Sequence, residues 1–337
     1  MLEDIRVKRR DFLLSLMAFS GSVAASQLPL QRAIAQSRLV GAGASFPAPL
    51  YQRWFNEYQK ATGTQVDYQS VGSGSGVRQF TAGTVDFGAS DVAMKDEEIA
   101  GVSNGVVLLP MTAGSIVVAY NAGIDLQLTR QQLVDVFLGN ITNWNQIGGP
   151  NKPISVVYRS DGSGTTAVFT NHLSAISSAW SNGPGKGKSI QWPVGIGAKG
   201  NEGVTAQIKQ REGTIGYVEY GYATRNGLKT AKLQNKAGSF VAASSATVAE
   251  TLRQVTLPAN LRAFIDDPSG AGSYPIATYT WILAYKNYGD SAKAQTLKNV
   301  LNWCLESNQQ AIAGQLGYIP LPNSVISRVK QAISTIS

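Results

Sequence analysis

Short apolar runs typical of buried strands alternate with amphipathic stretches from Leu39 onward. Between Pro47 and Gly63, large apolar residues recur at helical spacing; proline suits a first helical turn and glycine suits a helix end. The apolar run 85–89 that follows is predicted to be a strand. Because strands that alternate with helices assemble into parallel sheets, the pattern predicts an α/β fold with helices on both faces of the sheet.

The order of these elements predicts two α/β lobes. The extended runs 106–120 and 276–285 are expected to form a pair of crossing strands, which returns the C-terminal part of the chain to the first lobe. Three helices are predicted to close the chain, at 292–305, 307–314 and 324–336. Residues 181–201 contain six glycines, two prolines and little periodicity, so they are predicted to form a surface loop.

Three loops rich in glycine and serine each follow a predicted strand and precede a predicted helix, at residues 41–47, 72–76 and 160–165. The third loop follows a strand that ends in Arg159. It offers backbone N–H groups, hydroxyls and a guanidinium where a helix N-terminus concentrates positive potential. A further predicted strand delivers Asp91 to its carboxyl end, where open α/β sheets bind ligands. The sequence therefore predicts an oxyanion site.

The composition excludes several classes of protein. The 337 residues fit one large or two ordinary domains, and the net charge of +8 includes no basic run interleaved with aromatic residues, so no nucleic-acid partner is expected. With one cysteine, Cys304, and one histidine, His172, an internal disulfide and a soft-metal site are excluded. Cys304 is predicted to be a small buried apolar residue. A Ser–His–Asp hydrolase would have to use His172, yet the G-x-S-x-G motif is absent, so neither catalysis nor a cofactor is expected.

Residues 1–35 are predicted to be an export signal peptide. The basic residues 8–10 precede an apolar stretch at 12–25, and Ala33-Ile34-Ala35 offers a small-x-small cleavage site. The apolar stretch is too short for a comfortable membrane span, and no cysteine near the cleavage site could carry a lipid anchor. The basic residues also resemble a twin-arginine signal, so the twin-arginine and Sec routes both stay open. The mature protein is expected to be soluble and periplasmic.

Four segments carry a resemblance to a known family. They read GAGASFPAPLY (41–51), TVDFGASD (84–91), RSDGSGT (159–165) and GTIGYVE (213–219). In this order, across the mature chain, they closely resemble the periplasmic phosphate-binding proteins of ABC-type phosphate uptake systems, the PstS family. The resemblance implies a two-lobed type II periplasmic binding-protein fold that closes about a hinge over a ligand in the interlobe cleft. Residues 36–116 and 278–337 would form lobe 1, and residues 117–277 lobe 2.

The same resemblance implies a function and a set of site residues. The protein would be an extracytoplasmic, high-affinity receptor for inorganic phosphate, a monomer without enzymatic activity that delivers phosphate to a membrane ABC permease. The family's phosphate contacts fall on Ser45, Phe46, Ser73, Asp91, Arg159, Ser163, Gly164 and Thr165. Asp161 would pair with Arg159 without contacting the ligand. Since the second loop reads Gly-Ser-Gly-Ser-Gly here, whether Ser75 assists or replaces Ser73 stays open.

The chemistry of these residues favours a protonated oxyanion. Hydroxyls, N–H groups and a guanidinium supply donors to a desolvated anion, whereas the Asp91 carboxylate would repel it unless the ligand carries a proton to donate. Phosphate carries such a proton near neutral pH and sulfate does not, so Asp91 is expected to exclude sulfate. Arsenate or another protonated oxyanion remains an alternative ligand. A hydrolase and a surface interaction protein are the alternatives from other classes.

Overall fold

The computed structural model describes residues 38–337, and the predicted export signal lies outside this part. Its main sheet has nine strands, in the order β2-β1-β3-β12-β4-β8-β6-β7, with β9 paired to β4. These strands are β1 Leu39–Gly43, β2 Val66–Ser70, β3 Phe87–Ser90, β4 Val106–Tyr120, β6 Ser155–Arg159, β7 Ile196–Ala198, β8 Thr214–Glu219, β9 Lys229–Thr230 and β12 Ala277–Tyr285. A small second sheet holds β5 Gln127–Leu128, β10 Lys232–Gln234 and β11 Phe240–Val241.

Strand β4 is shared by the two parts of the main sheet. Its residues 106–115 pair antiparallel with β12, and its residues 116–120 pair antiparallel with β8. The strand is buried along nearly its whole length, as expected for an apolar strand with neighbours on both edges. The predicted crossing of the runs 106–120 and 276–285 is therefore confirmed, and the first run is one continuous strand.

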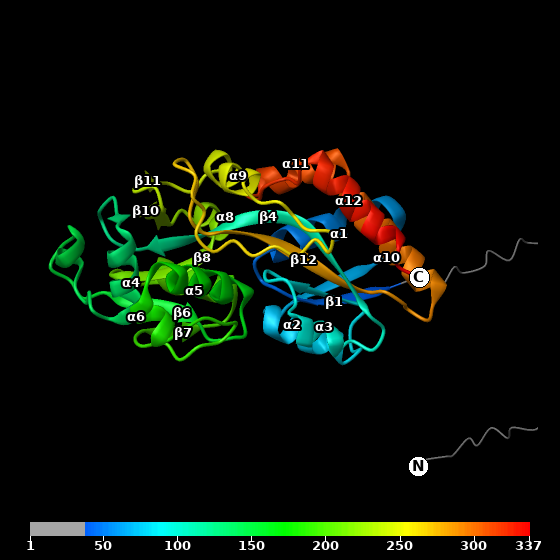
Figure 1. The fold of residues 1–337 in the computed structure, drawn as a ribbon, viewed down its shortest axis with the longest axis horizontal. Helices are drawn as coiled ribbons and strands as arrows, with labels where there is room; N and C mark the ends of the chain where they lie inside the picture. The colour runs from blue at the N-terminus through cyan, green and yellow to red at the C-terminus, as the bar shows by residue number, and fades with distance from the viewer. Residues whose placement is uncertain (1–37) are drawn as a thin grey trace, which may run out of the picture. The chain divides into compact units, whose positions relative to one another are not determined.

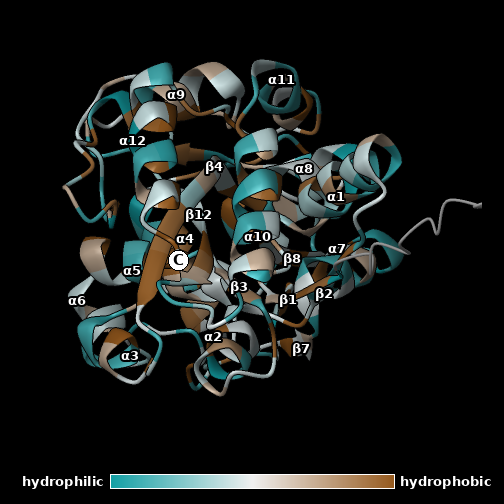
Figure 2. Ribbon diagram, turned by 90° about the vertical axis from the view of Figure 1, so that its right-hand side faces the viewer, coloured by the Kyte–Doolittle hydropathy of each residue, from teal (hydrophilic) through white to brown (hydrophobic). Residues whose placement is uncertain are grey.

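Helices cover the sheet on both sides (Figure 1). They are α1 Ala48–Thr62, α2 Ser73–Thr81, α3 Asp96–Ala100, α4 Arg130–Leu138, α5 Gly164–Ile176, α6 Ser178–Asn182, α7 Gly200–Gln210, α8 Tyr220–Arg225, α9 Ser245–Arg253, α10 Ser291–Cys304, α11 Ser307–Gln315 and α12 Asn323–Ser334. Helices α1 and α2 pack on the strands near the N-terminus, α5 and α7 pack beside β8, and the C-terminal helices return to α1 and β4. The central strands are mostly hydrophobic, whereas the helices around them turn hydrophilic residues outward (Figure 2).

Two local predictions are wrong. Residues 181–201 are not a continuous surface loop, because they include β7, which pairs in register with β6, and the start of α7. Hydrogen bonds from the neighbouring strand β6 order this segment, although its own composition does not predict a strand. In addition, α2 begins inside the second glycine-rich loop, at Ser73. Two glycines in this helix allow close packing: Gly76 lets α2 approach the backbone of β1, and Gly74 lies against Gly162.

Cys304 and His172, the two residues considered for metal binding or catalysis, are both buried. Cys304 lies at the end of α10 with no exposed surface, and burial raises the pKa of its thiol far above the ordinary value. Cys304 is thus a buried apolar residue, as predicted. Burial lowers the pKa of His172, whose Nδ1 lies 2.9 Å from the carbonyl oxygen of Asp266. Within residues 38–337, no helix combines the length and the apolar character needed to cross a bilayer.

Two helical glycines should respond in opposite ways to replacement by alanine. Gly76 is the fourth residue of α2, and a Cβ there would lie 2.4 Å from Cα of Gly43 and 2.8 Å from the carbonyl oxygen of Ala42. Gly203 is the fourth residue of α7, and its Cβ would meet nothing closer than 3.6 Å. We expect Gly76→Ala to lower the free energy of unfolding by roughly 1–3 kcal/mol through overpacking. Gly203→Ala should raise it by up to about 1 kcal/mol through helix propensity.

Urea denaturation monitored by circular dichroism measures both changes. The comparison requires that the unfolding free energy falls with urea concentration at the same slope in the wild type and in both variants. Equal stability of the two variants would contradict the close approach of α2 to β1.

Candidate functional site

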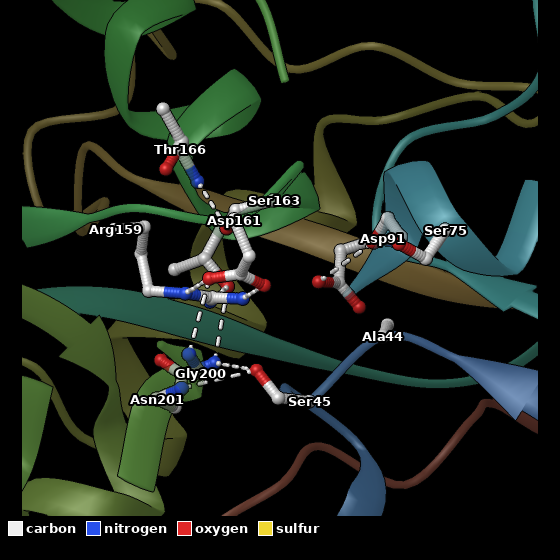
Figure 3. Close-up of polar contacts among 12 residues, drawn as sticks. Ala44, Ser45, Ser75, Asp91, Arg159, Asp161, Ser163, Thr166, Gly200 and Asn201 are labelled. Atoms are coloured by element: carbon white, nitrogen blue, oxygen red, sulfur yellow. Dashed lines mark hydrogen bonds and ion pairs between the residues drawn. The ribbon is translucent and has the colours of Figure 1, made fainter. Parts of the chain in front are cut away.

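The predicted site residues are gathered where four strand-to-helix connections meet. Ser45 and Phe46 follow β1, Ser73 begins α2, and Asp91 follows β3; Arg159 ends β6, and the remaining predicted residues lie at the start of α5. All eight predicted ligand residues are buried. Figure 3 shows Asp91 and the Arg159–Asp161 pair facing each other across the centre of this group, with Ser45 and Asn201 below them.

Glycines allow the second and third loops to touch. The backbone N–H of Gly74 donates to the carbonyl oxygen of Gly162 at 2.8 Å. A Cβ on Gly164 would lie 2.5 Å from Oγ of Ser73 and 2.8 Å from Oδ2 of Asp91, so only glycine fits there. Residues from separate parts of the sequence therefore lie within contact distance around one point.

Arg159 is held by a two-pronged ion pair. Its Nε and Nη2 atoms donate to the two carboxylate oxygens of Asp161 at 2.8 and 2.6 Å. Burial of Arg159 opposes its charge, but the hydrogen bonds to Asp161 and the negative charge of Asp161 together outweigh this effect and raise the pKa of the guanidinium. Asp161 also accepts from the backbone N–H of Gly200 at 3.1 Å. With two of its nitrogens bound to Asp161, Arg159 has Nη1 free to face Thr165, whose Oγ1 lies 3.4 Å away.

The hydroxyls of the site accept hydrogen bonds from fixed donors. Oγ of Ser163 accepts from the backbone N–H of Thr166 at 3.0 Å, as the N-cap of α5. Oγ of Ser73 accepts from the backbone N–H of Asp91 at 3.3 Å, and its own proton has only a long contact of 3.5 Å with Oδ2 of Asp91. Since a hydroxyl has one proton and two lone pairs, acceptance leaves the proton available to a further partner.

Asn201 is a site residue that sequence reasoning missed. It is fully buried near the start of α7, and its Nδ2 donates to Oγ of Ser45 at 2.9 Å and to Oγ1 of Thr165 at 3.2 Å. Its position at the end of the predicted surface loop 181–201 gave no indication of burial. Only the pairing of β7 with β6 reveals that this segment lies against the site.

Two backbone N–H groups add to the donors. In residues 38–337, the N–H of Phe46 and that of Gly164 have no protein acceptor. Gly164 is the first residue of α5, where helix N–H groups lack intrahelical partners. The Phe46 segment is held in place from the other side, because its carbonyl oxygen accepts from the hydroxyl of Tyr318 at 2.7 Å.

Asp91 supplies an acceptor among these donors. The Thr280 hydroxyl lies 3.0 Å from its Oδ1, and the Thr278 hydroxyl donates to its backbone carbonyl at 2.9 Å. Burial raises the pKa of Asp91 to about 7, although the bond from Thr280 and the charge of Arg159 both act to lower it. The two threonines were missed by sequence reasoning; their i, i+2 spacing in the predicted strand 276–285 was the available indication that they share a face.

Ser75 is placed differently from Ser73. Its Oγ accepts from Nη2 of Arg78 at 2.9 Å, and the residue is only partly buried (Figure 3). Among residues 38–337, no cluster of three His, Cys, Asp or Glu side chains could hold a metal ion. The site is therefore a set of buried donors around one carboxylate, which suits a tetrahedral oxyanion that carries a proton.

Comparisons with known proteins agree with this chemistry. Residues 30–308 match the PBP superfamily domain. The chain is 42% identical over 315 residues to the phosphate-binding protein PstS of Haemophilus influenzae, covering 88% of this chain and 92% of that protein. It is 33% identical over 331 residues to the phosphate-binding protein PstS of Methanocaldococcus jannaschii, covering 87% of this chain and 85% of that protein.

Solved structures share the fold. A phosphate-binding protein from Stenotrophomonas maltophilia superposes with a TM-score of 0.72 at 24% identity, covering 88% of this chain and 93% of that one. The high-affinity periplasmic phosphate-binding protein PfluDING, solved with bound phosphate, gives 0.72 at 22% identity with the same coverage. The chain thus has the two-lobed type II periplasmic binding-protein fold predicted from its sequence.

Behind Asn201 lies a buried acid, Glu219, which ends β8. Its carboxylate accepts from the N–H groups of Gly221 and Tyr222 at 2.7 and 3.1 Å and lies 4.0 Å from Arg225. Burial raises the pKa of Glu219 to about 8 despite these partners. The folded protein therefore retains a proton that the unfolded chain, with an ordinary glutamate, releases above about pH 4.3.

This proton should make the ligand-free protein less stable as the pH rises from about 5 to about 8, because there the folded state binds more protons than the unfolded state. Replacement Glu219→Gln removes the effect. We expect the free energy of unfolding of the wild type, relative to this variant, to fall by up to about 1.4 kcal/mol per pH unit in that range. Urea titrations at several pH values measure it, with Glu97→Gln, at an exposed position, as control. If the difference in unfolding free energy between the wild type and Glu219→Gln does not change with pH, Glu219 is ionised in the folded protein throughout this range.

Proposed function

The chain belongs to the PstS family of phosphate-binding proteins, and we propose that it is an exported receptor that binds inorganic phosphate and delivers it to a membrane ABC permease. It is a binding protein and not an enzyme. The proposal depends on one observation: the site combines several hydrogen-bond donors that are available to a ligand with one buried acceptor, the Asp91 carboxylate. Identity to PstS proteins over most of the chain supports the same reading.

The donors and the single acceptor of the site complement the oxygens and the proton of phosphate. The hydroxyls of Ser45, Ser73, Ser163 and Thr165, the N–H groups of Phe46 and Gly164 and the Nη1 group of Arg159 supply donors to the oxygens of a desolvated anion. Such pairing is required because an unpaired buried charge is very costly. The Asp91 carboxylate accepts the proton that phosphate still carries near neutral pH. Ser73, which is fully buried beside Asp91, is the better candidate for contact than Ser75.

The arrangement of the sheet supports two lobes that close over the ligand. β4 changes its partner from β12 to β8 between Ser115 and Ile116, close to the predicted lobe boundary after residue 116. We place residues 36–116 with 278–337 in lobe 1 and residues 117–277 in lobe 2. The bond from Gly74 to Gly162 then joins the lobes directly, as a closed form requires. The protein is exported by the twin-arginine or the Sec route. It acts in the periplasm as a monomer after removal of residues 1–35.

A melting experiment on phosphate-stripped protein tests the function. Phosphate at about 100 times its dissociation constant should add roughly 2.7 kcal/mol to the unfolding free energy. Arg159→Ala removes a charge-assisted bond worth on the order of 1.5–3 kcal/mol, so at the same phosphate concentration its gain should fall to about 0.3–1.3 kcal/mol.

Arg130→Ala is the matched control, because Arg130 forms a similar two-pronged pair with Asp267, both bonds being 2.8 Å, away from the site residues. This variant should keep the full gain. If phosphate does not change the melting temperature of the wild type, the proposed function is wrong. A rise in melting temperature with arsenate alone would identify another protonated oxyanion as the ligand.

Replacement of Asp91 tests the selectivity. Asp91→Asn keeps the shape of the side chain but supplies an amide that can turn its N–H₂ group toward the ligand. We expect phosphate affinity to change modestly, whereas sulfate, which the wild type rejects, becomes a measurable competitor. Competition calorimetry on both proteins gives the answer. If sulfate is excluded equally by both, Asp91 does not set the selectivity.

A further inference from the structure

The side-chain amide of Asn201 has a fixed orientation. Its Oδ1 lies 2.9 Å from the backbone nitrogen of Glu219, and a backbone N–H can only donate. The oxygen of the amide must therefore face Glu219, and Nδ2 must face the site. The residue has no exposed surface, so water does not compete for these positions.

This orientation determines where two hydroxyl protons point. Oγ of Ser45 accepts from Nδ2 of Asn201 at 2.9 Å and from its backbone N–H at 3.1 Å, which occupies both lone pairs. Oγ1 of Thr165 accepts from the same Nδ2 at 3.2 Å and from Nη1 of Arg159 at 3.4 Å. A hydroxyl with both lone pairs occupied can act only as a donor to a third partner. Both protons are thereby directed away from Asn201 and Arg159, and that of Thr165 lies on the side of Asp91, where the proposed ligand would bind.

We propose that Asn201 is a positioning residue for phosphate binding, which makes the hydroxyls of Ser45 and Thr165 obligatory donors to the anion. The proposal rests on the proposed function. Ser45 follows β1 and Thr165 is the second residue of α5, on opposite lobes in the division given above. Asn201 thus aligns one hydroxyl from each lobe, and it can do so only when the lobes have met. Contact with the ligand is made by the hydroxyls and not by Asn201 itself.

A double-mutant cycle separates this role from a purely structural one. Asn201→Leu has a similar volume and no charge. It leaves Ser45 with only the bond from the backbone N–H of residue 201 and Thr165 with only the bond from Nη1 of Arg159, so neither hydroxyl is still obliged to donate to the ligand. By calorimetry, we expect it to weaken phosphate binding on the order of 10-fold in the wild-type background. In the Ser45→Ala background the same change should weaken binding by roughly threefold or less, because one of the hydroxyls that it orients is already gone. Structural damage from the unpaired Glu219 N–H acts equally in both backgrounds and cancels.

Asn235→Leu is the matched control. Asn235 is equally buried and uses its amide in the same way, donating to three backbone carbonyls and accepting from the N–H of Ser239, but away from the site. It should lower the melting temperature without changing phosphate affinity. If Asn201→Leu does not fold, Asn201→Asp enters the same cycle, since its charge acts in both backgrounds. An equal loss with and without the Ser45 hydroxyl, or no loss at all, overturns the proposal; a wild type that does not bind phosphate overturns the proposed function instead.

Discussion

A buried hydroxyl whose lone pairs are already occupied is the constraint on which this protein depends. Ser45 and Thr165 each accept two hydrogen bonds from donors that the fold holds in place, so each hydroxyl can only donate its proton to a further partner. Unpaired buried donors cost free energy in the empty protein. An oxyanion removes that cost, and the affinity of the site then comes from donors that were oriented in advance and lose little entropy on binding.

This orientation requires loops from distant parts of the chain to meet, and small residues decide whether they can. Gly164 lies where any Cβ would collide with Ser73 and Asp91, and Gly74 binds Gly162 through the backbone. The glycines of the three loops therefore do more than form turns. They bring the start of α5 against the start of α2, so that N–H groups, hydroxyls and a carboxylate reach one small volume. Bulkier residues would hold the same groups too far apart to surround one anion.

The sequence allowed much of this to be predicted, because the local signals and the chemistry agree. The three loops, the crossing of β4 with β12 and the burial of Cys304 follow from periodicity, glycine placement and composition. Asn201 could not be found in this way, since its role depends on the pairing of β7 with β6, a contact between segments whose own patterns are weak. Thr280 escaped for a related reason: its partner Asp91 is distant in the sequence, and a threonine in a strand is usually only a packing residue.

Selectivity in such a site depends on a single proton. In the proposed complex Asp91 and phosphate would share one proton between two oxygens, and the contact would be satisfied whichever of them holds it. Sulfate brings no proton, so the contact fails unless Asp91 is protonated itself. Burial pushes Asp91 toward that protonated state and raises its pKa to about 7, while Thr280 and Arg159 act in the opposite direction. Burial on one side, and a hydroxyl and a guanidinium on the other, thus act in opposite directions on the carboxylate that would distinguish two anions of the same shape in the proposed function.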